Sequence, residues 1–239
     1  MLKTLRISFA LKNTYRVNGI LYGIRQIPLI GKLFPADIYG IDAFKMLANI
    51  IGWIWELITA VFGKILYFFL MLALPLMLME VTAEEAPRVF LHLFVGLSVM
   101  GAYANDLMFK ANKERYYGII LLGMNAKQFM LIQYGYALVK LFVGFVLCGL
   151  VLRNWVPLAV WEVVLLPLGV AGFKTAYVAV ELARYEKTGT MELKSKWRRF
   201  DWIGMLLMVG IIYGLPIAGY SLPRMGSLVL LVLGIVCGL

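Results

Sequence analysis

The chain has 239 residues, of which 62% are hydrophobic and only 15% are charged. Soluble domains average about 45–50% apolar residues, so this composition and the mean hydropathy of +0.86 exclude an ordinary soluble domain. The formal net charge is +10. The basic residues lie in loops between hydrophobic runs, however, and not on a soluble face with interleaved aromatic residues, which argues against nucleic-acid binding.

The hydrophobic runs predict an all-α protein, a polytopic transmembrane helical bundle with an N-terminal interfacial helix. Each span needs about 20 apolar residues to cross about 30 Å of hydrocarbon, so the chain has room for about six spans. Residues 1–56 are expected to form a cytoplasmic basic segment and the interfacial helix, and residues 57–239 to form the transmembrane domain. The expected spans lie at about 57–79, 88–109, 128–152, 156–182, 202–222 and 225–239.

The first hydrophobic run, residues 41–79, is too long for one span. Asp42 is suited to cap a helix at its start, and Trp53 and Trp55 suit the headgroup level. We therefore expect this piece to lie along the inner interface and to bend into the first span at about Leu57.

Charge in the short loops predicts the orientation. Seventeen lysines and arginines lie on one side of the expected spans and three on the other. Because basic loops stay in the cytoplasm, the N-terminus, Arg115 and Arg198 are expected inside and Glu84 outside. This describes a multi-pass protein of the plasma (inner) membrane.

The two ends of the chain carry separate expectations. The first 35 residues contain no uninterrupted apolar core, which argues against a cleaved signal peptide. The last hydrophobic run, residues 225–239, would be about 22 Å long as a helix, which is shorter than the hydrocarbon core. We expect the natural chain to continue beyond Leu239 or this helix to pack obliquely in an assembly.

The loop at residues 110–127 has the most informative pattern. It begins with charged residues, continues as a short amphipathic helix, and turns at Gly123 before Asn125, which is suited to cap the next helix. A helix this short and apolar needs a surface to bury against, either the bilayer interface or a partner protein.

Residues 123–129, with the sequence G-M-N-A-K-Q-F, follow a Leu-rich segment and precede a span. This arrangement resembles the permease subunits of ABC transporters, particularly the exporter-like ABC-2 group, whose coupling helix is followed by a turn, a capping residue, basic residues and an aromatic residue. The resemblance covers nearly the whole chain loosely, and an ordinary interfacial loop helix is the alternative. It implies that the following residues couple to an ATPase: Arg115, Tyr116, Ile119, Ile120, Leu121, Leu122, Gly123 and Asn125.

The resemblance implies a permease subunit of an ATP-driven transporter, an exporter, which forms the substrate path. Its partners would be ABC ATPase subunits, a second permease copy or half, and the lipid bilayer. No cofactor is expected on this chain, because ATP and Mg²⁺ would bind the partner ATPase. No phosphate-binding loop or nucleophile elbow occurs in the sequence, so no enzyme activity is expected.

Two other functions stay open: a non-transporting membrane scaffold or accessory subunit, and a secondary transporter. A secondary transporter predicts inverted repeats and broken helices that meet at midplane acids. The sequence shows no such repeat, and the central charge is Lys140.

Ionisable residues within the expected spans are functional candidates because they are costly in lipid. Lys140, Lys174 and Glu162 are the candidates for a substrate path or gate. Lys140 lies about twelve residues into its helix, near the midplane, and a buried structural pair is its alternative role. Lys64 and Lys174 can instead extend to the inner interface.

Smaller signals concern packing. The G-x-x-x-G at Gly210 and Gly214 predicts a close helix contact, and Pro216 is a candidate for a kink. His92, the only histidine, is expected to pack or to form a hydrogen bond.

The remaining residues of note are two cysteines and a polar pair. Cys148 and Cys237 lie in apolar runs and are expected to be small core residues. Asn105 and Asp106 are expected to end a helix in the headgroups.

Overall fold

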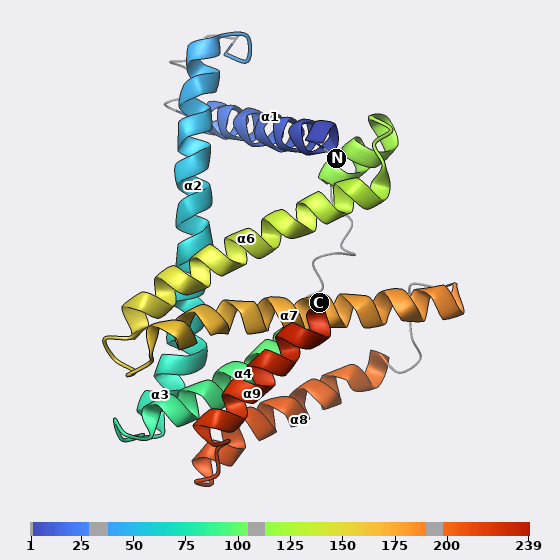
Figure 1. Ribbon diagram of the computed structural model, residues 1–239. Helices are drawn as coiled ribbons and strands as arrows, with labels where there is room; N and C mark the ends of the chain where they lie inside the picture. The colour runs from blue at the N-terminus through green and yellow to red at the C-terminus, as the bar shows by residue number, and fades with distance from the viewer. Residues whose placement is uncertain (1, 29–37, 105–112, 190–197) are drawn as a thin grey trace. The chain divides into compact units, whose positions relative to one another are not determined.

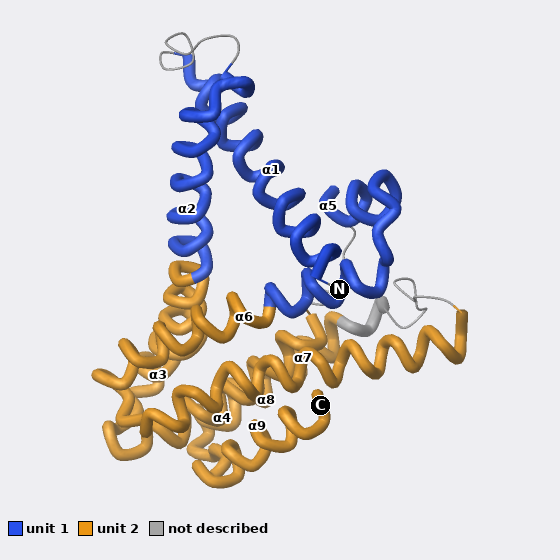
Figure 2. Tube along the Cα trace, turned by 45° about the horizontal axis from the view of Figure 1, so that its top comes forward, with its two compact units in different colours: residues 1–60, 109–137 blue, residues 61–108, 138–239 orange. Residues whose placement is uncertain are grey.

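The computed structural model describes residues 2–28, 38–104, 113–189 and 198–239, with side chains from residue 202 onward in the last range. Over these residues the chain consists of helices and connecting turns, without a strand (Figure 1). The all-α class is therefore confirmed. The chain divides into two compact units, which Figure 2 colours separately: unit 1 is residues 1–60 and 109–137, and unit 2 is residues 61–108 and 138–239.

Four helical segments are long and apolar enough to cross a membrane, namely Asp42–Leu78, Ala86–Ala104, Ala126–Leu152 and Val160–Thr188. Two shorter apolar helices follow, at Trp202–Ile217 and Arg224–Gly238. The four long helices indicate a membrane protein, because a span requires about 20 apolar residues.

The helix bounds follow in chain order. They are α1 (Leu2–Gln26), α2 (Asp42–Phe68), the π-helical turn η2 (Phe69–Ala73), α3 (Leu74–Leu78), α4 (Ala86–Ala104), α5 (Lys113–Arg115), the π-helical turn η3 (Tyr116–Leu121), α6 (Ala126–Leu152), α7 (Val160–Thr188), α8 (Arg198–Ile217) and α9 (Arg224–Gly238).

The first hydrophobic run differs from the sequence expectation. Helix α2 begins at Asp42 as predicted, but it continues without an end at Leu57. The departure from α-helical geometry comes later, in η2, directly before Pro75. The apolar pattern alone could not distinguish these positions, because it is helical on both sides of Leu57.

Proline accounts for the irregular turn. Pro75 has no N–H to donate to the carbonyl of Met71, four residues earlier, and its ring crowds that carbonyl. The hydroxyl of Tyr213 donates to the Met71 carbonyl instead, at 3.0 Å. A side chain of α8 thus satisfies a backbone group that α3 leaves open, as buried backbone groups in lipid require.

Helix α4 is the centre of unit 2. It contacts α7, α8 and α9, and 67% of its most apolar window is buried inside the protein, more than for the other three long helices. Four phenylalanine rings stack or meet edge to face beside it: Phe68, Phe90, Phe94 and Phe145. Aromatic pairs of this geometry add to the stabilisation from burial.

Glycines allow α7 and α9 to approach closely. A methyl group added to Gly172 would come within 2.6 Å of the Ile235 Cα, and one added to Gly234 within 2.7 Å of the Phe173 ring. The close contact therefore uses the G-x-x-x-G at Gly234 and Gly238, which the sequence analysis did not single out.

The G-x-x-x-G that the sequence analysis did select is not used in this way. An added methyl group at Gly210 or Gly214 would meet no atom within 4 Å in the described part of the chain. Both motifs have the same spacing, and only the tertiary arrangement separates them. Pro216 lies in the last turn of α8, so it ends that helix and does not kink its middle.

The remaining packing expectations have mixed outcomes. His92 is buried, and its Nδ1 accepts a hydrogen bond from the backbone N–H of Leu222 at 3.3 Å. Cys148 is buried as expected, whereas Cys237 is exposed, and both are free thiols. Asn105 and Asp106 lie outside the described residues.

In unit 1, α1 packs on the first part of α2. Val17 and Leu21 of α1 are buried with Ala48 of α2 and with Ile38 from the turn before it. This small apolar cluster is supplemented by the polar contacts described below.

Candidate functional site

The predicted short helix before α6 is present. Residues Lys113–Arg115 and Tyr116–Leu121 form one helical segment, which ends at a left-handed Gly123 with φ +59°. Asn125 Oδ1 then accepts a hydrogen bond from the backbone N–H of Gln128 at 3.1 Å. The predicted turn at Gly123 and cap at Asn125 are therefore confirmed.

One side of this short helix is fixed against α6 within unit 1. Gly118 is buried, and a methyl group there would come within 2.6 Å of the Phe129 ring. Glu114 Oε2 accepts a hydrogen bond from Gln133 Nε2 at 3.0 Å. These contacts leave little freedom for the helix to rotate.

The same helix contacts α1. The rings of Tyr15 and Tyr117 meet edge to face with centroids 5.2 Å apart. Desolvation, hydrogen bonding with Tyr117 and the nearby charge of Glu114 raise the pKa of Tyr15 to about 12. Tyr15 therefore remains a neutral phenol over the physiological pH range.

The other side of the short helix is apolar and exposed. The exposed fractions are 55% for Tyr116, 65% for Ile120, 57% for Leu121 and 54% for Leu122. We call these four residues the docking face. Arg115 and Ile119, which were also predicted to couple, are half-buried.

A polar cluster in unit 1 was missed by the sequence analysis. The carboxylate of Glu56 on α2 is 3.3 Å from Lys12 Nζ and 2.7 Å from Arg16 Nη1 of α1. It also accepts a hydrogen bond from Tyr136 Oη of α6 at 2.5 Å. Glu56 therefore joins three helices of unit 1.

The cations of this cluster have further contacts. Arg16 Nη2 donates to Asn13 Oδ1 at 2.7 Å and to Asn49 Oδ1 at 3.1 Å, and its guanidinium lies over the Trp53 ring. Lys12 Nζ lies 3.5 Å from the centroid of the Tyr136 ring. A signal was present in the sequence, because α1 has five basic residues and no acidic one. Acidic partners for these basic residues could therefore come only from other segments of the chain.

Glu162 is fully buried at the start of α7. Its two oxygens bind Arg224 Nε at 2.8 Å and Nη2 at 2.6 Å, and Oε2 also accepts from the N–H of Ala159 at 2.7 Å. A bidentate pair of this kind fixes geometry strongly. The arrangement suits an anchor between the first turns of α7 and α9 better than a residue of an open path.

Glu162 and Lys174 lie on the same helix, twelve residues and about 18 Å apart along α7, so they do not form one site. Lys140 on α6 and Lys174 on α7 are each half-buried, whereas Glu162 is joined to Arg224. The ammonium of Lys64 lies 4.5 Å from the centroid of the Phe145 ring, a distance at which a cation is attracted to the ring face.

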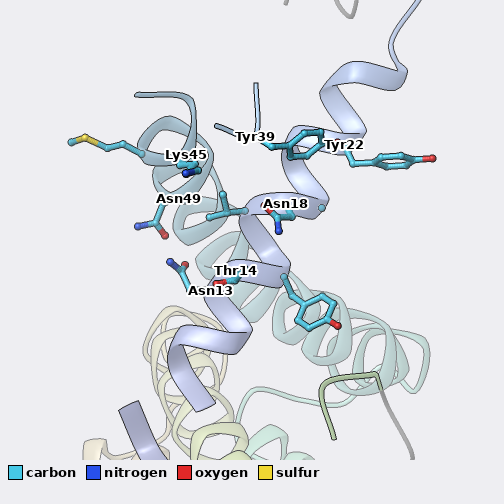
Figure 3. Close-up of a pocket in the computed structure, with 11 residues that line it drawn as sticks. Asn13, Thr14, Asn18, Tyr22, Tyr39, Lys45 and Asn49 are labelled. Carbon is cyan, nitrogen blue, oxygen red and sulfur yellow. The ribbon is translucent and has the colours of Figure 1, made fainter. Parts of the chain in front are cut away.

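A hollow of about 1010 Å³ lies between α1 and α2 in unit 1. Its lining is mainly amide, hydroxyl and aromatic, and Figure 3 shows Asn13 and Asn49 next to each other on its wall. Its charged lining residue, Lys45, pairs with Asp42 at 3.2 Å. Over the described ranges, no three His, Cys, Asp or Glu residues are grouped so that they could hold a metal ion.

Known proteins add no assignment. Comparisons with protein-family models, with curated proteins and with solved structures give no match. The features of the chain that bear on function are the docking face, the apolar helices and the loop pattern.

Proposed function

We propose that this chain is a permease subunit of an ABC transporter of the exporter-like ABC-2 group. It binds a separate ATPase through the docking face and forms the substrate path together with a second permease copy or half. The observation that carries the proposal is the docking face itself. Its four large apolar side chains are 54 to 65% exposed, on a helix whose opposite side is fixed to the rest of unit 1.

A helix of this kind suits a groove on a partner protein. Helix-in-groove interfaces place a few apolar anchors in a hydrophobic groove, and such anchors carry most of the binding energy. The contact of Gly118 with Phe129 and the hydrogen bond between Glu114 and Gln133 hold the anchors in a fixed orientation before binding. A fixed orientation lowers the entropy lost on association.

The proposed topology extends the four long helices to six spans. Helices α8 and α9 supply the fifth and sixth spans. The apolar parts of these helices, Trp202–Ile217 and Arg224–Gly238, are about 22 to 24 Å long, which is shorter than a typical hydrocarbon core. Spans of this length are accommodated by local thinning of the bilayer or by oligomerisation. The charge asymmetry of the loops favours a cytoplasmic N-terminus in the inner membrane.

The chemistry of ATP is assigned to the partner. ATP and Mg²⁺ bind the ATPase subunits, and this chain has no catalytic role of its own. Movement of the ATPase would reach unit 1 through the docking face and, from there, α1 and α6, which the short helix contacts through Tyr15 and Gln133. Nucleic acid is not among the proposed partners.

Co-purification tests the proposal. The tagged chain, extracted in mild detergent, is expected to bring down an ATPase whose turnover it changes after reconstitution in lipid. If the intact chain neither binds nor alters the turnover of an ATPase from its own membrane, the scaffold function becomes the better account.

Lys140→Ala separates docking from transport. Because Lys140 lies on α6 outside the docking face, the variant should bind the ATPase as the parent does. We expect it to change transport or basal ATP turnover in reconstituted vesicles. If both stay at the parent level, Lys140 has the structural role instead.

A further inference from the structure

A second hollow, of about 680 Å³, lies in unit 2 between the turn that joins α3 to α4 and the end of α8. Its apolar wall includes Leu78, Val89 and Pro216. The polar groups of its lining are two carboxylates, one guanidinium and two hydroxyls, which belong to Glu80, Glu85, Arg88, Ser221 and Tyr213. The Tyr213 hydroxyl already donates to the Met71 carbonyl. The hollow lies where helices α3 and α8 end and α4 begins, so its polar rim is at the headgroup level if these helices span the bilayer.

Two polar atoms of this hollow are buried without a hydrogen-bond partner among the described residues: Arg88 Nε and Ser221 Oγ. The Arg88 guanidinium lies 3.6 Å from Glu85 Oε1, which is too long for a hydrogen bond. Buried donors that lack partners cost free energy. Both atoms are closed off even when the hollow is empty, so a ligand would reach the guanidinium through its terminal nitrogens, on a side chain that is 42% exposed.

The backbone at Glu80 gives a third, independent observation. Glu80 has φ +51°, and it is the non-glycine residue with positive φ in the described part of the chain. It follows the last turn of α3, where glycine is the usual residue because a side chain is disfavoured in the left-handed region. Strain of this kind is characteristic of functional positions, and here it places a carboxylate at the rim of the hollow.

We propose that this hollow binds an amphiphile whose head group carries both an ammonium and an acidic group. The terminal nitrogens of Arg88 donate hydrogen bonds to the acidic group, Glu80 and Glu85 attract the ammonium, and the apolar wall covers the start of the hydrocarbon tail. A purely anionic head group would face two carboxylates and only one guanidinium, so it is disfavoured.

This head-group chemistry has two sources, a bilayer phospholipid or a free zwitterionic amphiphile. The inference does not depend on the permease proposal, because it uses only the groups around the hollow in unit 2. Two experimental arms separate the sources.

The first arm uses the full chain in nanodiscs that contain phosphatidylethanolamine and phosphatidylglycerol in equal amounts. Lipids retained by the released protein are counted by native mass spectrometry. We expect phosphatidylethanolamine to be retained about tenfold over its competitor, since charge-assisted hydrogen bonds discriminate at that level. Arg88→Gln and Glu80→Asn should each remove the preference.

Glu80→Asn is also expected to fold, so a lost lipid preference in this variant would not be caused by misfolding. Asparagine tolerates the left-handed region better than most residues, so this variant should be at least as stable as the parent. Glu84→Gln is the matched control, because Glu84 is an exposed acid of the same turn and does not line the hollow. It should leave the preference unchanged.

The second arm uses delipidated protein in detergent, titrated with lysophosphatidylethanolamine or with phosphoethanolamine, which has no tail. Binding in both arms identifies a bilayer phospholipid, and binding in the second arm alone identifies a free amphiphile. The proposal is overturned if neither arm shows a preference that Arg88→Gln abolishes. It is also overturned if phosphoethanolamine competes as well as the tailed probe.

Discussion

Glu56 shows how one side chain can hold several helices of a unit together. Its side chain is 14% exposed and meets two cations and a phenol. Removing one member of a largely buried ion pair leaves the remaining charges without compensation. The residue was missed in the sequence because its partners are 40 to 80 positions away.

Glu56→Ala should therefore lower the free energy of unfolding by about 2 kcal/mol or more. Lys45→Ala is the control, because it removes an exposed ion pair and leaves Asp42 at the start of α2. Asp42 pairs with Lys45 at the surface with a side chain 97% exposed, and exposed pairs contribute at most about 1 kcal/mol. Thermal unfolding in detergent measures both, and equal losses would show that Glu56 is not the joining residue.

Tyr213 permits a finer test. Its hydroxyl replaces the N–H that Pro75 cannot offer to the Met71 carbonyl. Tyr213→Phe should cost about 1 kcal/mol of stability, whereas Tyr220→Phe, at a side chain that is 72% exposed, should cost much less. If Tyr213→Phe leaves the stability unchanged, the Met71 carbonyl accepts a hydrogen bond from another donor.

The residues whose roles could be predicted from the sequence are those that act on neighbours close in the chain. Gly123 and Asn125 act on their own neighbours within three residues, so their roles as turn and cap could be predicted before the structure. The hydrogen bonds of Tyr213 and Glu56 join segments far apart in the chain. The five basic residues of α1 indicate acidic partners elsewhere, but they do not identify Glu56.

Among the helices, the α7 and α9 pair shows the same difference: a local pattern can be predicted from the sequence, but the partner that it contacts cannot. Two of the G-x-x-x-G motifs in the sequence lie in the apolar C-terminal part, at Gly210 and at Gly234. Only the second lies in a close helix contact. Spacing predicts the capacity to pack closely, and the partner decides whether it is used.

Gly172→Ala tests this contact, because the new methyl group would collide with the backbone of Gly234 and Ile235. We expect a loss of about 1–3 kcal/mol, the usual cost of overpacking. A methyl group added at Gly210 meets no atom within 4 Å. Gly210→Ala should therefore raise the free energy of unfolding by up to about 1 kcal/mol, because alanine has the higher helix propensity. Unfolding by a denaturing detergent compares the two, and a stable Gly172→Ala would argue against the close approach of α7 and α9.

At the scale of the whole molecule, composition was sufficient to predict an all-α membrane protein with long apolar helices. It was not sufficient to place the helix bounds. Helix α7 begins at Val160, and the apolar residues Val156 and Leu158 are buried in the turn before it. Hydropathy does not separate a buried turn from a span, so the predicted start at residue 156 came too early.

The orientation gives a prediction for the complete chain. In a version with Cys148 and Cys237 replaced by serine, Glu84→Cys should react with an impermeant thiol reagent in intact cells, because its loop is expected outside. Arg115→Cys and Arg198→Cys should react only after the membrane is opened. Labelling of Arg198→Cys from outside would contradict the proposed topology.

The proposed binding of an ATPase to the docking face is tested by the double variant Ile120→Asp with Leu121→Asp. Both side chains are exposed, so the fold should survive. A carboxylate buried unpaired in a groove costs several kcal/mol, and about 1.4 kcal/mol corresponds to tenfold in affinity.

The measurement is the affinity of the purified chain for its ATPase, together with the ATP turnover of the complex. Ile27→Asp, which changes an exposed apolar residue elsewhere in unit 1, is the control and should behave as the parent. We predict that the double variant loses binding by orders of magnitude and no longer alters turnover. If it binds and stimulates the ATPase as the parent does, the docking face is not the coupling surface.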